Sequence, residues 1–324
     1  MSPSNHQENP ALRMMEEGNF KGAQEALENS LKINKRVFGE QSAESAEDCR
    51  NLGVLFFRTF NFEFALDYFR QALSIDEKIF GKNDPQVAVD LSNLANTLAE
   101  NDELVQAQHM AKRALTIDKN HYGENSAETA SAFSSLGGIL FRMGALKKAL
   151  DAYHHSLTIQ KIIYDQNQPE LAITLSSIGN IKQKMQDFKG AIADYNQALQ
   201  ISSESFGPSH RYCASLYQLI GSTYQESEKH QKALEAFEKA YAIDKEAFQN
   251  NPHPAVARDL NNLGVAHESL NNWKEAVENY EAAVNMLESL FSSHHPNVKG
   301  ARTNLKRAQH YLSRHGTNRV QGSR

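Results

Sequence analysis

The sequence is poor in the residues that build disulfide-stabilised or membrane-spanning proteins. Its 324 residues include two cysteines and one tryptophan, and no apolar run is long enough to span a bilayer. Cys49 and Cys213 stand far apart at helix-compatible positions, which favours two reduced, buried thiols. The N-terminus lacks the apolar segment of a secretory signal, and no Asn-x-Ser/Thr acceptor occurs. These absences predict a cytoplasmic protein that does not bind membranes.

Excess positive charge and catalytic motifs are missing as well. The formal net charge is −5, which gives no reason to expect nucleic acid as a partner. Gly137 and Gly138 are not followed by Lys-Ser/Thr, so they form no phosphate loop. His267 and Glu268 begin a zinc-protease pattern, but Asn271 stands where the second histidine is required. We therefore expect a non-enzymatic protein with no cofactor and no metal site.

What the sequence does contain is a pattern that returns every 42 residues, as from Leu52 to Leu94, with one step of 43 from Ile220 to Leu263, where a loop carries an extra residue. Its marks are a large aliphatic residue followed by a small one, then an alanine and an aromatic residue further along. The aliphatic–small pair occurs at Leu52-Gly53, Leu94-Ala95, Leu136-Gly137, Ile178-Gly179, Ile220-Gly221 and Leu263-Gly264. A fixed period of this length is typical of a solenoid, in which each repeat packs only on its neighbours.

Each repeat predicts two antiparallel helices. In one repeat the first helix begins at Pro85 with Asp84 as its N-cap, and the second covers about residues 104–121. The predicted fold is an all-α, right-handed superhelical solenoid of antiparallel helix pairs, with about seven units and a truncated first unit. The predicted domains are a disordered tail (1–9), the repeat array (10–297), a capping helix (298–315) and a second disordered tail (316–324).

The motif Leu-Gly/Ala-x-x-aromatic, followed by Ala and by aromatic-x-x-Ala, resembles the tetratricopeptide repeat (TPR), whose usual length is about 34 residues. NNLG at 261–264, ALSI at 72–75 and HHPNV at 294–298 are similar to the longer repeats of kinesin light chains. The resemblance covers about residues 10–315. The heptad segment by which kinesin light chains join the motor does not occur in this sequence, so we expect a different TPR protein.

The resemblance implies that the first helices line a concave face and indicates which of their positions point inward. These positions carry mainly Asn, Ser and Gln, whose amides and hydroxyls can pair with a peptide backbone. Arginine and lysine among them favour an acidic residue in the ligand. The candidate peptide-binding residues are Arg50, Asn51, Arg58, Asn93, Asn96, Arg142, Ser176, Asn180, Lys184, Gln218, Ser222, Asn261 and Asn262.

The predicted function is a scaffold or adaptor that binds an extended segment of a partner protein in this groove. Polar residues on a concave face are also typical of any solvated solenoid, and Asn51, Asn93, Asn262 and Asn304 could instead bond neighbouring backbone. An alternative is a regulatory or self-associating TPR protein that acts through its convex face. The sequence leaves the partner and the oligomeric state open.

Overall fold

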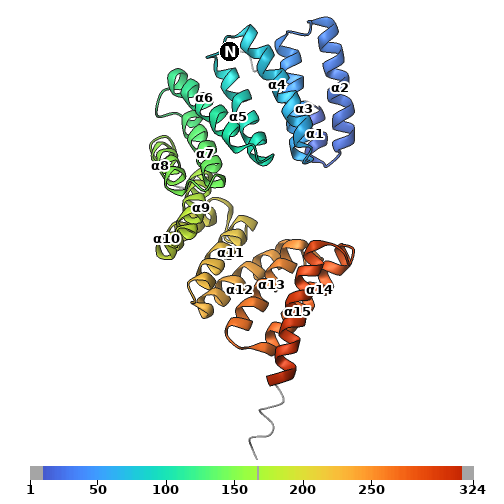
Figure 1. Cartoon of the computed structure of the whole chain (residues 1–324), viewed down its shortest axis with the longest axis vertical. Coiled ribbons are helices and arrows are strands. Elements are labelled where there is room, and N and C mark those ends of the chain that lie inside the picture. The colour runs from blue at the N-terminus through green and yellow to red at the C-terminus, as the bar shows by residue number, and fades with distance from the viewer. Residues whose placement is uncertain (1–9, 166–167, 316–324) are drawn as a thin grey trace, which may run out of the picture. The chain divides into compact units, whose positions relative to one another are not determined.

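The computed structural model describes residues 10–165 and 168–315, and these ranges contain fifteen α-helices and no strand (Figure 1). They form two compact units, of which unit 1 ends at Ile163 and unit 2 begins at Tyr164. Unit 1 contains α1 (Pro10–Glu16), α2 (Phe20–Val37), α3 (Ala43–Arg58), α4 (Phe62–Ile79), α5 (Pro85–Glu100), α6 (Leu104–Tyr122), α7 (Ala127–Arg142) and α8 (Leu146–Ile163). Unit 2 contains α9 (Pro169–Lys184), α10 (Phe188–Phe206), α11 (Arg211–Glu226), α12 (His230–Ala247), α13 (Pro254–Ser269), α14 (Trp273–Leu290) and α15 (Pro296–His315).

Helices alternate between two roles in each unit. We call the first helix of each pair an A helix; these are α1, α3, α5 and α7 in unit 1 and α9, α11 and α13 in unit 2. The last helix, α15, stands at an A position without a B partner among the described residues, and we count it as an A helix; the other helices are B helices. Each paired A helix packs on its own B helix, and each B helix packs on the next A helix of the same unit, as the neighbouring ribbons of Figure 1 show. The predicted all-α array of helix pairs is thus confirmed.

The structure describes some of the predicted boundaries and not others. The last A helix, α15, begins at Pro296 rather than at residue 298, because proline has no N–H to leave unsatisfied in a first helical turn. The predicted tails, 1–9 and 316–324, lie outside the described residues. That residues 10–297 act as one continuous array stays a prediction. In the two described ranges, no helix is both long and apolar enough to cross a membrane.

In five of the described helix pairs, an aromatic ring of the B helix lies on a glycine of the A helix. A Cβ atom added to Gly53 of α3 would lie 2.6 Å from the ring of Phe69 on α4, closer than real contacts allow. Phe69 is fully buried there. The same contact joins Gly137 to Tyr153, Gly179 to Tyr195, Gly221 to Phe237 and Gly264 to Tyr280. The small residue of the repeat is therefore required because the ring of the B helix occupies the space of its side chain.

The α5–α6 pair explains a departure from the sequence pattern. Ala95 stands at the glycine position of α5, and Ala111 stands at the aromatic position of α6; both are buried. A Cβ on the A helix and a ring on the B helix cannot share one space, so the two alanines replace glycine and ring together.

Three A helices in each unit have a side-chain cap, and the capping group differs between the units; α9 has no side-chain cap. In unit 1 a side-chain oxygen accepts the hydrogen bond of a first-turn N–H; the acceptors are Ser42, Asp84 and Ser126. In unit 2 the Nδ1 atom of an imidazole accepts it, over 3.1–3.2 Å; the acceptors are His210, His253 and His295. Each of these rings stacks on a phenylalanine at the C-terminal end of the preceding B helix, with ring centroids 4.6, 3.4 and 4.2 Å apart; the phenylalanines are Phe206, Phe248 and Phe291. The caps of unit 2 therefore require a neutral imidazole, since a protonated ring has no acceptor.

We predict that the His253 cap loses its stabilising effect in mild acid. Burial lowers the pKa of His253, and Arg211 and Arg258 lower it further against the opposing charge of Asp244. A histidine whose folded pKa is depressed stabilises the fold above its unfolded pKa of about 6.5, and this stability is lost as the pH falls through the folded pKa. Loss of this cap costs about 1 kcal/mol. Because buried carboxyl groups titrate in the same range, the contribution of His253 is measured by urea unfolding at pH 7.5 and pH 5.5 as a difference between the wild type and a variant with another cap.

The matched control replaces His253 with serine, the cap that unit 1 uses at α3 and α7. Between pH 7.5 and pH 5.5 the unfolding free energy of this variant should change less unfavourably than that of the wild type. An equal change in both proteins would contradict the role of the His253 imidazole.

Candidate functional site

The candidate peptide-binding residues all lie on A helices, but in two separate groups. In unit 1 they are Arg50, Asn51 and Arg58 of α3, Asn93 and Asn96 of α5, and Arg142 of α7. In unit 2 they are Ser176, Asn180 and Lys184 of α9, Gln218 and Ser222 of α11, and Asn261 and Asn262 of α13. Each group is a candidate face of its own unit.

Arg50 is engaged by two buried carboxylates. Its Nη2 lies 2.6 Å from Oδ2 of Asp76 on α4, and its Nε lies 2.8 Å from Oδ1 of Asp90 on α5. The Asp76 and Asp90 side chains are 1% and 0% exposed. Burial raises the pKa of both carboxyl groups, and the Arg50 charge opposes that rise. The guanidinium therefore ties three helices together, and a ligand could use it only by breaking these bonds.

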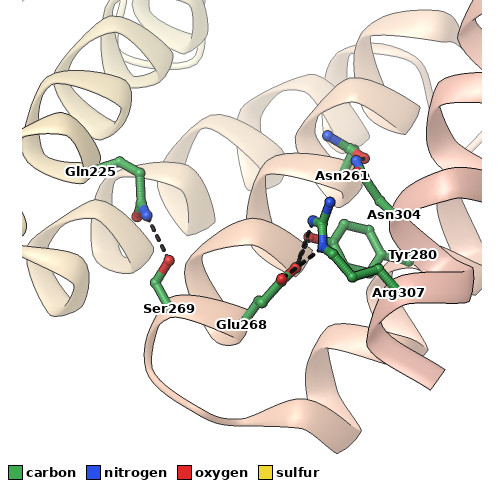
Figure 2. Close-up of polar contacts among 7 residues, drawn as sticks. All are labelled: Gln225, Asn261, Glu268, Ser269, Tyr280, Asn304 and Arg307. Carbon is green, nitrogen blue, oxygen red and sulfur yellow. Dashed lines mark hydrogen bonds and ion pairs between the residues drawn. The ribbon is translucent and has the colours of Figure 1, made fainter. Parts of the chain in front are cut away.

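Gln218 has a comparable role in unit 2, without the charge. Its Nε2 donates to Oδ1 of Asp259 on α13 over 2.6 Å. Burial raises the pKa of Asp259, and the nearby Asp244 carboxylate of α12 raises it further. Gln225 also bonds α11 to α13, through Oγ of Ser269 at 2.6 Å (Figure 2).

Further contacts join α13 to α15 (Figure 2). Nδ2 of Asn304 donates to Oδ1 of Asn261 over 2.8 Å. Arg307 donates to both carboxylate oxygens of Glu268 at 2.9 Å, and the hydroxyl of the buried Tyr280 donates to the same carboxylate. Hydrogen bonds and the Arg307 charge lower the pKa of Glu268 against the opposing effect of burial, which is the largest single influence. Asn261 thus contributes to the packing of the two A helices.

Other candidates bond to residues of their own helix or of a nearby helix in the same unit. The hydroxyl of Ser176 lies 3.0 Å from that of Tyr212, and Oδ1 of Asn180 accepts from the Tyr195 hydroxyl at 2.8 Å. Ser222 donates to a backbone carbonyl of its own helix. Arg142 pairs with Glu100 at 2.8 Å, but both side chains are more than one-third exposed, so this bond is weak.

Six candidates have no side-chain partner in the described part of the chain. Four are in unit 1, where they lie on the neighbouring helices α3 and α5; they are Asn51, Arg58, Asn93 and Asn96. Two are in unit 2, namely Lys184 and Asn262. Of the four asparagines that precede the repeat's leucine, Asn51, Asn93 and Asn262 therefore do not bond neighbouring backbone, and Asn304 bonds the Asn261 side chain. Unit 1 presents the largest set of unused amide groups.

Unit 2 has a hollow of about 500 Å³ between α13 and α15. Asn261 and Asn304 line it, as do Arg258 and Asn297, with proline, alanine and leucine side chains between them. Arg258 is half-exposed and lies 3.9 Å from Asp244. We did not predict Arg258 as a site residue, although it stands three residues before Asn261, a spacing that places both on one helix face.

The comparisons with known proteins agree with this architecture. One family model of the tetratricopeptide repeat matches residues 13–78, 50–120, 86–162 and 170–246, and a second model of the same repeat matches residues 257–297. No curated protein matches the chain.

Solved structures share the fold at low sequence identity. BtubC (BKLC) from P. vanneervenii is 18% identical, with a TM-score of 0.60 over 84% of this chain and 94% of that one. TPR-like repeats assigned to a kinesin light chain of Podosopora anserina are 14% identical, with a TM-score of 0.56 over 64% and 98%. A Rap protein complexed with Competence and Sporulation Factor is 16% identical, with a TM-score of 0.59 over 91% and 81%. Because the family models cover most of the sequence, and the glycine–aromatic helix pairs explain its pattern, the chain belongs to the tetratricopeptide repeat family.

Proposed function

We propose that this protein is a non-enzymatic scaffold of the cytoplasm, which binds an extended segment of a partner protein along the A helices of unit 1. The observation that carries the proposal is the set of unpartnered polar side chains on α3 and α5, namely Asn51, Arg58, Asn93 and Asn96. Elsewhere on the A helices most candidate side chains are used for packing. Polar groups that no internal bond requires are available to a ligand.

The chemistry of this set suits a peptide main chain. An asparagine amide offers two donors and one acceptor, so it can bond a peptide N–H and a peptide C=O. Asn51 and Asn93 occupy the same position in successive repeats, and Asn96 lies one helical turn after Asn93. An amide donor and acceptor are thus offered at Asn51 and again at Asn93, one repeat further along, and Asn96 adds a third amide.

Charge favours an acidic residue in the ligand. Arg58 is exposed at the end of α3 and has no partner among the described residues. Arg142 on α7 pairs only with the half-exposed Glu100, a bond that a ligand carboxylate could replace. Carboxylate–arginine bonds are stronger than those between neutral groups. The Rap protein solved with Competence and Sporulation Factor supports the general role, since a TPR-like fold there holds a partner.

The test is a double substitution, Asn93→Ala with Asn96→Ala, in the full-length chain. Peptides would be selected from a display library against the wild type, and their affinity for the variant measured by fluorescence polarisation. We expect affinity to fall at least tenfold, which corresponds to about 1.4 kcal/mol, or one to two lost hydrogen bonds. Asn180 is not used, because its loss would remove one of the two acceptors, Asn180 and Gln183, of the buried Tyr195 hydroxyl.

The matched control is Asn120→Ala with Asn125→Ala, two exposed asparagines that lie outside the A helices. It should bind the selected peptides as the wild type does, and both variants should melt within about 2 °C of it. If the Asn93/Asn96 variant selects and binds the same peptides as the wild type, the A-helix face of unit 1 is not the site. If that variant melts much lower, these asparagines are structural.

A further inference from the structure

Every turn from an A helix to its B helix contains one residue with positive φ. The residues at this position are Gly18, Phe60, Asp102, Gly144, Gln186, Glu228 and Asn271, with φ between 59° and 78°. Left-handed backbone is free of strain for glycine and tolerated by short polar residues, but it is unfavourable for bulky ones. Phe60 is the only large apolar residue in the set, and its φ is 60°.

The Phe60 side chain gains little from folding. It is 80% exposed, the largest exposed fraction among the large apolar residues of the described chain. The turn around it is closed by backbone bonds from Phe60 N to Phe57 O and from Asn61 N to Phe56 O, and by the Asn61 amide, which donates to Thr59; none of these bonds uses the Phe60 side chain. Neither the conformation nor the environment of this position therefore favours phenylalanine over the glycine or asparagine of other repeats.

Other aromatic rings lie close to Phe60 on one side of the turn. Its ring meets that of Phe62 edge-on at 6.2 Å, and Phe62 meets Phe57 at 5.7 Å. Phe64 is 58% exposed, and its ring contacts that of Phe56 with the two centroids 5.3 Å apart. A hollow of about 260 Å³, lined by Phe60, Asn61, Phe62, Glu63, Phe64 and Asn101, opens between this turn and the next A helix, α5. We call it the Phe60 hollow.

One acidic residue lines the Phe60 hollow, and two more follow Asn101 of its lining in the sequence. The exposed Glu63 lines it and has no partner in the part of the chain that the structure describes. The Asn101 amide, also in the lining, donates to the Glu103 carboxylate at 2.8 Å, and the exposed Asp102 lies between these two residues. The nearest cation in the sequence is Arg58. A partner that carries positive charge beside an apolar side chain is therefore complementary to this surface.

We propose that the Phe60 hollow is a second docking site, which takes one aromatic or leucine side chain from a segment of a partner protein that also carries lysine or arginine. A pocket of this size accepts a single large side chain, and aromatic anchors in such pockets contribute most of the affinity of many interfaces. The site lies on the turns of unit 1 rather than on its asparagine face, so this proposal does not rest on the proposed function. A scaffold with both sites could hold two segments at once.

The experiment uses four fluorescein-labelled synthetic peptides of equal length. Each has tryptophan or alanine at its centre, flanked by lysines or by glutamates. Fluorescence polarisation would measure their affinity for the full chain and for the Phe60→Asn variant. Asparagine is the residue that the chain itself uses at the equivalent position, Asn271, in the α13–α14 turn. Glu63→Gln tests the charge, and Ile33→Gln, at another exposed apolar site, is the matched control.

The tryptophan–lysine peptide should bind the wild type at least tenfold more tightly than the other three. Phe60→Asn should lose this preference, Glu63→Gln should weaken it, and Ile33→Gln should leave it unchanged. Phe60→Asn should melt at the wild-type temperature or about 2 °C above it, because asparagine relieves the strain.

Four results would overturn the proposal. The first is that all four peptides bind the wild type equally, or that none binds at millimolar peptide concentration. The second is that Phe60→Asn binds the tryptophan–lysine peptide as the wild type does, and the third is that the tryptophan–glutamate peptide binds more tightly than the tryptophan–lysine peptide. The fourth is a large fall in the melting temperature of Phe60→Asn. A change in the sedimentation mass of Phe60→Asn would instead show that the hollow is covered by a second copy of the chain.

Discussion

Replacing Phe69 with alanine is expected to destabilise the protein by about 3–5 kcal/mol, the cost of removing a fully buried ring. Gly53→Ala alone is expected to cost about 1–3 kcal/mol, because the new Cβ would lie 2.6 Å from the same ring. When the ring is already absent, the added methyl group meets no atom of it. Alanine is then the better helix former by about 1 kcal/mol, so Gly53→Ala should stabilise the Phe69→Ala protein.

This change of sign can be measured by a double-mutant cycle with urea unfolding monitored by circular dichroism. The double variant reproduces, in the α3–α4 pair, the arrangement that the chain itself uses at Ala95 and Ala111 of the next pair. If the two substitutions add without interaction, the ring and the Cβ do not compete for space, and our account of the repeat's small residue is wrong.

Arg50→Met is expected to cost about 3–5 kcal/mol at pH 8, because it leaves Asp76 and Asp90 buried without their cation. Burial already raises the pKa of both carboxyl groups, so in the folded protein they bind protons more readily than in the unfolded chain. For such groups, stability is highest at low pH and falls as the pH rises toward the folded pKa. Without Arg50 the rise in pKa is larger. The deficit of the variant should therefore shrink between pH 8 and pH 5.

Arg58→Met is the matched control, since Arg58 lies on the same helix and has no partner among the described residues. It should change the unfolding free energy by less than about 0.5 kcal/mol at either pH. Arg50→Gln offers a second comparison, because it copies Gln218, which donates to Asp259 at the corresponding place in unit 2. A deficit of Arg50→Met that stays constant between pH 8 and pH 5 would contradict the proposed protonation of the aspartates.

Only part of the candidate site could be predicted from the sequence. The 42-residue period indicates which residues lie on A helices, because the helical repeat fixes the face on which each position stands. It does not indicate which side chain reaches which partner. Arg50 bonds residues 26 and 40 positions away, and Asn261 bonds a residue 43 positions away. Sequence reasoning therefore treated Arg50 and Asn51 alike, although one is bound to two carboxylates and the other is free.

The sequence by itself determined the fold family, the helix pairs and the small residue opposite each ring, because these depend on local spacing that every repeat restates. Only the tertiary structure decided which polar groups are used for packing and which remain for a ligand. It also decided that histidines cap three A helices of unit 2, and that Phe60 stands exposed in a left-handed turn. These features depend on the distance between residues that are far apart in the chain, and a pattern of residue types does not contain that distance.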